Sequence, residues 1–200
     1  MTLKKGRLRL SADYIPAACL CLCAVVFGRR FPAACLCVLL HEGAHIAVLL
    51  SLSDDVIEIT LGCMSADIID RGRLSRSDAQ QAMISAAGPI ANLVFAAVFR
   101  YLYIILPYDL FRECTMISAA VGAFNLLPIS VTDGGELAAM ILRRVFSERT
   151  ASIVTNAITI VFLIPLCVLA FYVLLRSKNN FTLLLAAMSV AHSVLRGAFE

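Results

Sequence analysis

Long stretches without charged side chains dominate the sequence and constrain its fold more than any other feature. Five stretches contain no Lys, Arg, Asp or Glu, and a sixth contains only Glu42. They cover residues 14–28, 31–53, 79–99, 114–132, 150–175 and 179–195. With 60% apolar residues, 16% charged residues and a mean hydropathy of +0.88, the chain cannot build a water-compatible surface. We therefore predict an all-α fold, a polytopic transmembrane bundle of about six helices in a lipid bilayer.

The basic residues predict the orientation of this bundle. If the spans alternate in direction, eleven of the 17 basic residues fall on one side of the membrane. These are Lys4, Lys5, Arg7, Arg9, Arg71, Arg73, Arg76, Arg143, Arg144, Arg149 and Arg196. The richer side is expected to be cytoplasmic, which places both termini inside the cell and the protein in the cell membrane. The first span is expected to stay uncleaved, and no basic run with interleaved aromatic residues points to nucleic acid.

The longest polar stretch, residues 54–78, departs from the helical pattern. Residues 56–61 and 64–69 are rich in β-branched side chains and alternate roughly, and Gly62-Cys63 separates them. This pattern predicts a small β-hairpin at the membrane surface, and the alternative is an irregular loop with amphipathic patches.

One apolar stretch contains an unusual cluster of ionisable residues, His41-Glu42-Gly43-Ala44-His45. Each ionisable group in hydrocarbon costs about 2.5–3.5 kcal/mol, so the cluster needs a compensating interaction. Histidines four residues apart lie about 40° apart around a helix and one turn along it, which lets both imidazoles bind one metal ion. Glu42 is then placed to accept a proton from a zinc-bound water. The alternative is a cluster of hydrogen bonds between helices without metal.

A catalytic zinc usually has three protein ligands, so the sequence must supply a third one. Polar candidates near the other apolar stretches are Asn92, Asn125, Asp133, Asn156 and His192. Asp133 is favoured because its carboxylate offsets zinc charge, and because Pro128 before it and Gly134-Gly135 after it let the backbone bend. His192 is the rival third ligand. The alternative is that His192 binds no metal and is a histidine inside the bundle that interacts with a partner group.

Three motifs in this order resemble the signatures of the site-2 protease family. They are His41-Glu42-Gly43-Ala44-His45, Ala87-Gly88-Pro89-Ile90-Ala91-Asn92, and Asn125-Leu126-Leu127-Pro128 leading to Asp133-Gly134-Gly135. The resemblance implies that His41, His45 and Asp133 bind zinc, that Glu42 is the general base, and that Asn125 lies near the site. Val131-Thr132 stands where the family commonly has Pro-Leu.

The second motif has a simpler interpretation as well. Ser85, Ala86, Ala87, Gly88 and Ala91 are the small residues that close helix packing in lipid requires. Asn92 is a candidate neighbour of the site.

The size of the chain is closest to the membrane core of the stage IV sporulation protein FB branch of that family. We expect residues 1–200 to form a single membrane-embedded metalloprotease domain without a PDZ or CBS domain. Substrate choice would then depend on the membrane core or on regulatory membrane proteins that act as partners.

The expected activity is that of an intramembrane zinc metalloprotease with one Zn²⁺ per chain. It would hydrolyse a peptide bond in or next to the transmembrane segment of a membrane-associated protein, as in regulated intramembrane proteolysis. A strand edge of the predicted hairpin could hold the unwound substrate. The alternatives are a non-catalytic zinc-binding membrane protein that captures membrane partners, and a zinc transporter, which would show several polar sites along a path.

Overall fold

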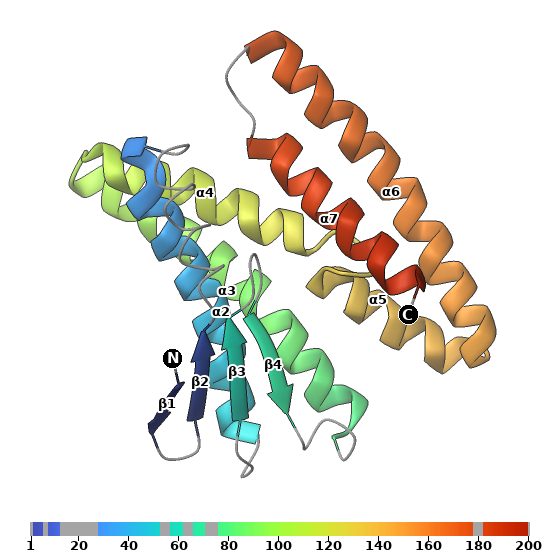
Figure 1. Cartoon of the computed structure of the whole chain (residues 1–200). Coiled ribbons are helices and arrows are strands. Elements are labelled where there is room, and N and C mark those ends of the chain that lie inside the picture. Colours follow the sequence, from blue (N-terminus) through green and yellow to red (C-terminus); the bar gives the residue numbers. More distant parts are fainter. Residues whose placement is uncertain are drawn as a thin grey trace. The chain divides into compact units, whose positions relative to one another are not determined.

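The computed structural model describes residues 2–5, 8–12, 28–52, 57–61, 66–70, 76–177 and 182–199. These residues form six α-helices, one short 3₁₀ helix (η1, Gly28–Arg30) and a four-stranded β-sheet (Figure 1). The chain divides into two compact units, Met1–Ala123 and Phe124–Glu200. The first contains the sheet, α2 (Phe31–Leu52), α3 (Asp78–Ile105) and most of α4 (Asp109–Asn125), and the second contains α5 (Asp133–Val145), α6 (Glu148–Ser177) and α7 (Thr182–Phe199).

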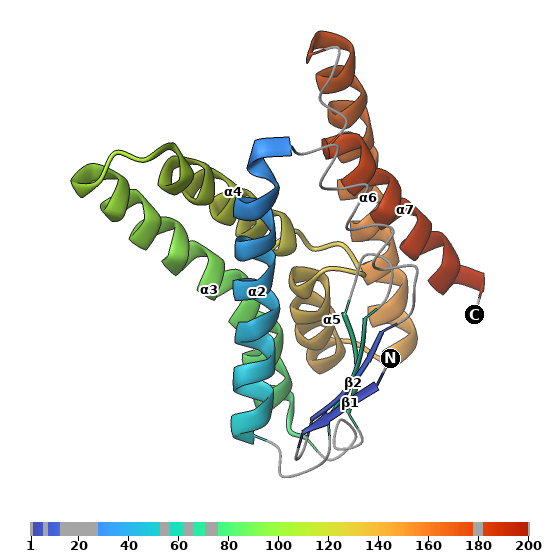
Figure 2. The same ribbon diagram turned by 60° about the vertical axis from the view of Figure 1, so that its left-hand side comes forward.

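Helix α2 (Phe31–Leu52) has a buried stripe with a strict four-residue spacing. The stripe consists of Ala33, Cys37, His41, His45 and Leu49. Residues four apart lie on one face of a helix. Helix α2 lies beside α3 (Figure 2), and Leu49 on the buried face clusters with Ile84 of α3. Both histidines are therefore on the face that α2 turns toward its neighbour.

Helix α3 (Asp78–Ile105) begins at a capping box. The Ser77 hydroxyl accepts a hydrogen bond from the Gln80 amide at 3.3 Å, and the Gln80 side chain accepts one from the Ser77 amide at 3.0 Å. Its buried face is lined by Ile84, Ser85, Gly88, Pro89, Asn92 and Ala96. The small residues on this face confirm the predicted packing role of the second motif, since they let neighbouring helices approach closely.

Helix α4 (Asp109–Asn125) reaches α3 through another small residue. A Cβ atom on Gly122 would lie 3.2 Å from the Pro89 carbonyl oxygen and 3.3 Å from Cβ of Asn92. The helix ends three residues before Pro128, in keeping with the steric restriction that proline places on its predecessor.

The sheet has the strand order β1-β2-β3-β4. Strands β3 (Ile57–Leu61) and β4 (Ala66–Asp70) pair antiparallel, with Leu61 opposite Ala66, in the stretch where a hairpin is predicted. Strands β1 (Thr2–Lys5) and β2 (Leu8–Ala12) also pair antiparallel, and β2 runs parallel to β3. We did not predict the first two strands from the sequence, although Leu8-Arg9-Leu10-Ser11 alternates with the period of a strand.

In the second unit, hydrogen bonds order the turn that leads into α5 (Asp133–Val145). The Thr132 hydroxyl accepts a hydrogen bond from the Gly135 amide at 3.3 Å, which caps the helix, and donates one to the Ile129 carbonyl at 2.9 Å. The Ser130 amide donates to the Thr159 hydroxyl at 2.9 Å, which ties the turn to α6 (Glu148–Ser177). Thr132 thus has a structural task at the position where the sequence departs from the family pattern.

Gly134 and Gly135 correct the sequence-based view that they let the backbone bend. Both lie in the first turn of α5, and among the described glycines only Gly28 has a positive φ. A Cβ on Gly134 would collide with the Leu126 carbonyl, and one on Gly135 with the Ile129 carbonyl. The glycines are needed because the preceding turn lies directly against the helix.

The helices confirm the predicted fold class, a bundle of transmembrane helices. Three of them are long and apolar enough to cross a membrane: Phe31–Leu52, Asp78–Ile105 and Glu148–Arg176. Helix α4 has 17 residues and α7 (Thr182–Phe199) has 18, both below the ~20 residues of a perpendicular span. The predicted first span, residues 14–28, lies almost entirely outside the described residues, so the count of about six spans stays a prediction.

Candidate metal centre

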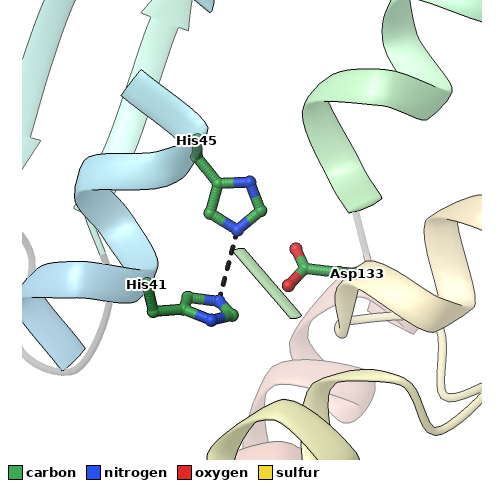
Figure 3. A group of neighbouring side chains, drawn as sticks. All are labelled: His41, His45 and Asp133. Atoms are coloured by element: carbon green, nitrogen blue, oxygen red, sulfur yellow. Dashed lines mark hydrogen bonds between the residues drawn. The ribbon is translucent and has the colours of Figure 1, made fainter. Parts of the chain in front are cut away.

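The two histidines of α2 point their Nε2 atoms at each other. Nε2 of His45 lies 3.2 Å from Nε2 of His41, and the rings meet edge to face with their centroids 4.8 Å apart (Figure 3). Both side chains are buried, with exposed fractions of 5% for His41 and 8% for His45. The predicted pairing of the imidazoles on one helix face is therefore present in the structure.

Hydrogen bonds to α3 orient each ring through its other nitrogen. Nδ1 of His45 lies 2.8 Å from the carbonyl oxygen of Ile84, so this nitrogen carries the proton and donates it. The lone pair of a neutral His45 is then on Nε2. Nδ1 of His41 lies 3.2 Å from Nδ2 of Asn92. A backbone carbonyl as the partner of one imidazole nitrogen is the usual arrangement behind a metal-ligating histidine.

A missing side chain on α3 leaves space beside the two Nε2 atoms. A Cβ on Gly88 would lie 2.8 Å from Nε2 of His41 and even closer to Nε2 of His45. Any residue other than glycine would therefore fill the region that both lone pairs can reach. Gly88 keeps this region open at the centre of a buried helix contact.

These features fit a zinc ion. Tetrahedral zinc with bonds of about 2.0–2.1 Å to nitrogen places two nitrogen ligands about 3.3 Å apart. The observed separation of the Nε2 atoms, 3.2 Å, is close to this value. Imidazole nitrogens are common zinc ligands, and the open region over Gly88 offers room for an ion.

Glu42 and Asn92 complete the polar groups of the first unit that the sequence singles out. Glu42 follows the first histidine directly and is half-buried. Asn92 is completely buried, and its Nδ2 atom lies 3.2 Å from Nδ1 of His41. The sequence did not identify the Ile84 carbonyl, because a backbone group leaves no signature in the side-chain pattern.

The other predicted site residues belong to the second unit. Asp133 is the first residue of α5, and its side chain is half-buried. Asn125 is the last residue of α4 and is also half-buried. His192, the rival ligand, is exposed on α7.

Two comparisons with known proteins bear on this arrangement. The model of peptidase family M50 matches residues 105–169, a segment that includes Asn125 and Asp133. A solved structure described as a site-2 protease from Methanocaldococcus jannaschii superimposes with a TM-score of 0.68. The match covers 98% of this chain and 94% of that chain, at 18% sequence identity. This chain has the site-2 protease fold. The fold that the resemblance to the site-2 protease family implies is thereby confirmed.

No curated protein matches the sequence, and the stage IV sporulation protein FB branch stays a prediction. The site-2 protease fold, the family M50 match and the three apolar helices together support a membrane metalloprotease.

Proposed function

We propose that this chain is an intramembrane zinc metalloprotease with His41, His45 and Asp133 as the ligands of one Zn²⁺ and Glu42 as the general base. The observation that carries the proposal is the pair of buried Nε2 atoms 3.2 Å apart, with a carboxylate at the next position of the same helix. The ligand chemistry supports it further, since two imidazoles and one carboxylate are a set that could hold a metal ion.

Zinc, when bound, lowers the pKa of a water ligand to about 7 and polarises a carbonyl oxygen. Glu42 accepts a proton from the attacking water and later passes it to the leaving amine. His45 keeps its orientation through the Ile84 carbonyl, so its lone pair stays directed at the metal.

The proposed substrate is a membrane-associated protein cleaved in or beside its transmembrane segment, as in regulated intramembrane proteolysis. A peptide bond inside an intact helix is hard to attack, so the substrate must unwind locally. Within the described sheet, β3 lies between two neighbours, and of the predicted hairpin only β4 is an edge strand. We therefore assign strand addition of the unwound substrate to β4.

The length and composition of the helices support a location in the membrane. Three described helices can span a bilayer by length and composition, and the excess of basic residues on one side favours cytoplasmic termini. We propose a multi-pass protein of the cell membrane with membrane proteins as substrates and as regulatory partners.

Glu42→Gln tests the catalytic part of the proposal, because it removes the base and keeps the size of the side chain. The full chain in detergent or nanodiscs should retain the zinc content of the parent. Cleavage of membrane-anchored candidate substrates should fall by about 10²–10⁴ or more. Glu148→Gln is the matched control, since that residue is exposed and pairs only peripherally with Arg143 at 3.8 Å.

The outcomes separate an enzyme from a binding protein. Parental cleavage by Glu42→Gln would refute the proposed mechanism. A parent that holds zinc and a membrane partner but never cleaves would instead support the non-catalytic zinc-binding alternative.

A further inference from the structure

We propose that Asn92 is a positioning residue for His41, whose amide oxygen accepts the Nδ1 proton of the imidazole when Nε2 binds the metal. The inference deepens the proposed function and rests on its assignment of His41 as a zinc ligand. Asn92, on α3, takes no part in the proposed reaction itself, and the inference gives this residue a specific task.

The burial of Asn92 is the first observation. Its side chain is completely buried, and its Oδ1 atom has no hydrogen-bond partner among the described residues. An unsatisfied buried polar group costs about 1–3 kcal/mol. Helix packing alone would therefore favour an apolar side chain of similar size here, and the amide must have another task.

The second observation is a continuous chain of hydrogen bonds with one direction. With Nδ1 of His45 as the donor to the Ile84 carbonyl, its Nε2 offers a lone pair and can accept a hydrogen bond from Nε2 of His41 across the 3.2 Å contact. Nδ1 of His41 is then unprotonated and accepts from Nδ2 of Asn92 at 3.2 Å. In this arrangement Oδ1 of Asn92 remains without a hydrogen-bond partner among the described residues.

Metal binding reverses the requirement at His41. A metal ligand must offer a lone pair, so the proton of a neutral His41 moves from Nε2 to Nδ1. Nδ1 then needs an acceptor where it previously had a donor. Rotation of the Asn92 amide by about half a turn exchanges Nδ2 for Oδ1 at nearly the same position, since the two groups have the same shape.

The surroundings of Asn92 restrict the change to its terminal amide. Gly122 of α4 packs so closely that its Cβ would lie 3.3 Å from Cβ of Asn92. This contact holds the base of the side chain while the amide turns. Asparagine suits the position because its amide can both donate and accept a hydrogen bond. An ionised aspartate can only accept, and leucine can do neither.

Metal affinity tests the inference in the full-length chain, with Co²⁺ as the spectroscopic probe and Zn²⁺ in competition. Asn92→Leu removes both donor and acceptor and should weaken Co²⁺ binding by about 10–100-fold, as loss of an outer partner of a metal ligand typically does. Asn92→Asp keeps the acceptor and should bind Co²⁺ as tightly as the parent or more tightly. Circular dichroism checks that both variants keep their helices.

A second measurement reads the proton itself. The chain has three histidines, so ¹⁵N labelling of histidine gives few signals to assign. The proton of His41 should be on Nε2 without metal and on Nδ1 with Zn²⁺ in the parent. In Asn92→Leu, the metal-free His41 should no longer be held with its proton on Nε2, whereas a merely structural role of Asn92 predicts the tautomer of the parent.

Equal Co²⁺ affinity of Asn92→Leu and the parent would overturn the inference, as would equal losses in Asn92→Leu and Asn92→Asp. A His41 proton that stays on Nε2 in the zinc-bound parent would also overturn it. A parent that binds neither ion would refute the zinc assignment and this inference together. A parent that binds metal with the expected Asn92 dependence but cleaves nothing would refute only the proposed proteolysis.

Discussion

Replacing Gly88 with alanine should abolish metal binding and leave the helices folded. The new methyl group would lie 2.8 Å from Nε2 of His41, 2.7 Å from its Cε1 and closer still to Nε2 of His45. Carbon atoms in ordinary contact are about 3.5–4.0 Å apart, so Cε1 of His41 would have to move away by at least roughly 0.8 Å. The methyl group would also occupy the space that both lone pairs face.

The expected size of the effect follows from this geometry. Overpacking of this kind typically costs 1–3 kcal/mol of folding free energy, which a helical membrane protein can tolerate. Metal binding suffers more, because the substitution disturbs two ligands at once. We expect zinc affinity to fall by more than the ~100-fold that loss of an outer partner can cost.

The assay is the zinc content of the purified protein, followed by Co²⁺ titration. Gly43→Ala is the matched control, because Gly43 belongs to the same motif and a Cβ there meets nothing within 4 Å. It should keep the parental zinc affinity and gain up to about 1 kcal/mol of helix propensity. His45→Ala should relieve the steric effect of Gly88→Ala, so the two changes should be non-additive in thermal unfolding by about 0.5–3 kcal/mol.

Parental zinc affinity in Gly88→Ala would refute the argument that the ion lies over this glycine. Additive stability effects of Gly88→Ala and His45→Ala would show that the methyl group and the imidazole do not compete for space.

The remaining predictions concern the third ligand and the orientation. Asp133→Ala should lose zinc and cleavage together, whereas His192→Ala should keep both, since His192 is exposed; the reverse result in a zinc analysis would make His192 the ligand. A reporter enzyme fused to the C-terminus should be active only when it requires the cytoplasm. Activity of the exported form of the reporter would mean that the span count or the orientation is wrong.

The sequence predicted the parts of the fold that depend on periodicity. Apolar stretches of helical length identified α2, α3 and α6, and β-branched alternation located the β3–β4 pair. It did not identify β1 and β2, because their pattern is short and two lysines interrupt it. Strand β2 pairs with residues 57–61, which are distant in the sequence, so it can be recognised as a strand only when this pairing is known.

The site shows the same division between side-chain pattern and spatial contact. The four-residue spacing of His41 and His45 predicts their pairing directly, and their Nε2 atoms do face each other. The sequence also marked Gly88 and Asn92, but gave packing as the main task of their segment. Which imidazole Gly88 or Asn92 contacts depends on how α2 and α3 align along their length. The sequence of one helix alone does not determine this alignment.

The alignment of α2 and α3 explains why both tasks can share one segment. Gly88 and Asn92 are four residues apart on α3, just as His41 and His45 are on α2. The equal spacing on the two facing helix surfaces brings these residues level with one another. Gly88 therefore faces the two Nε2 atoms, and the amide of Asn92 faces Nδ1 of His41. The close approach that small residues permit is therefore the condition for the hydrogen bonds that orient the rings. The same small residues therefore permit the helix packing and shape the metal site. A substitution that moves α2 and α3 apart should weaken both the packing of the helices and the binding of metal.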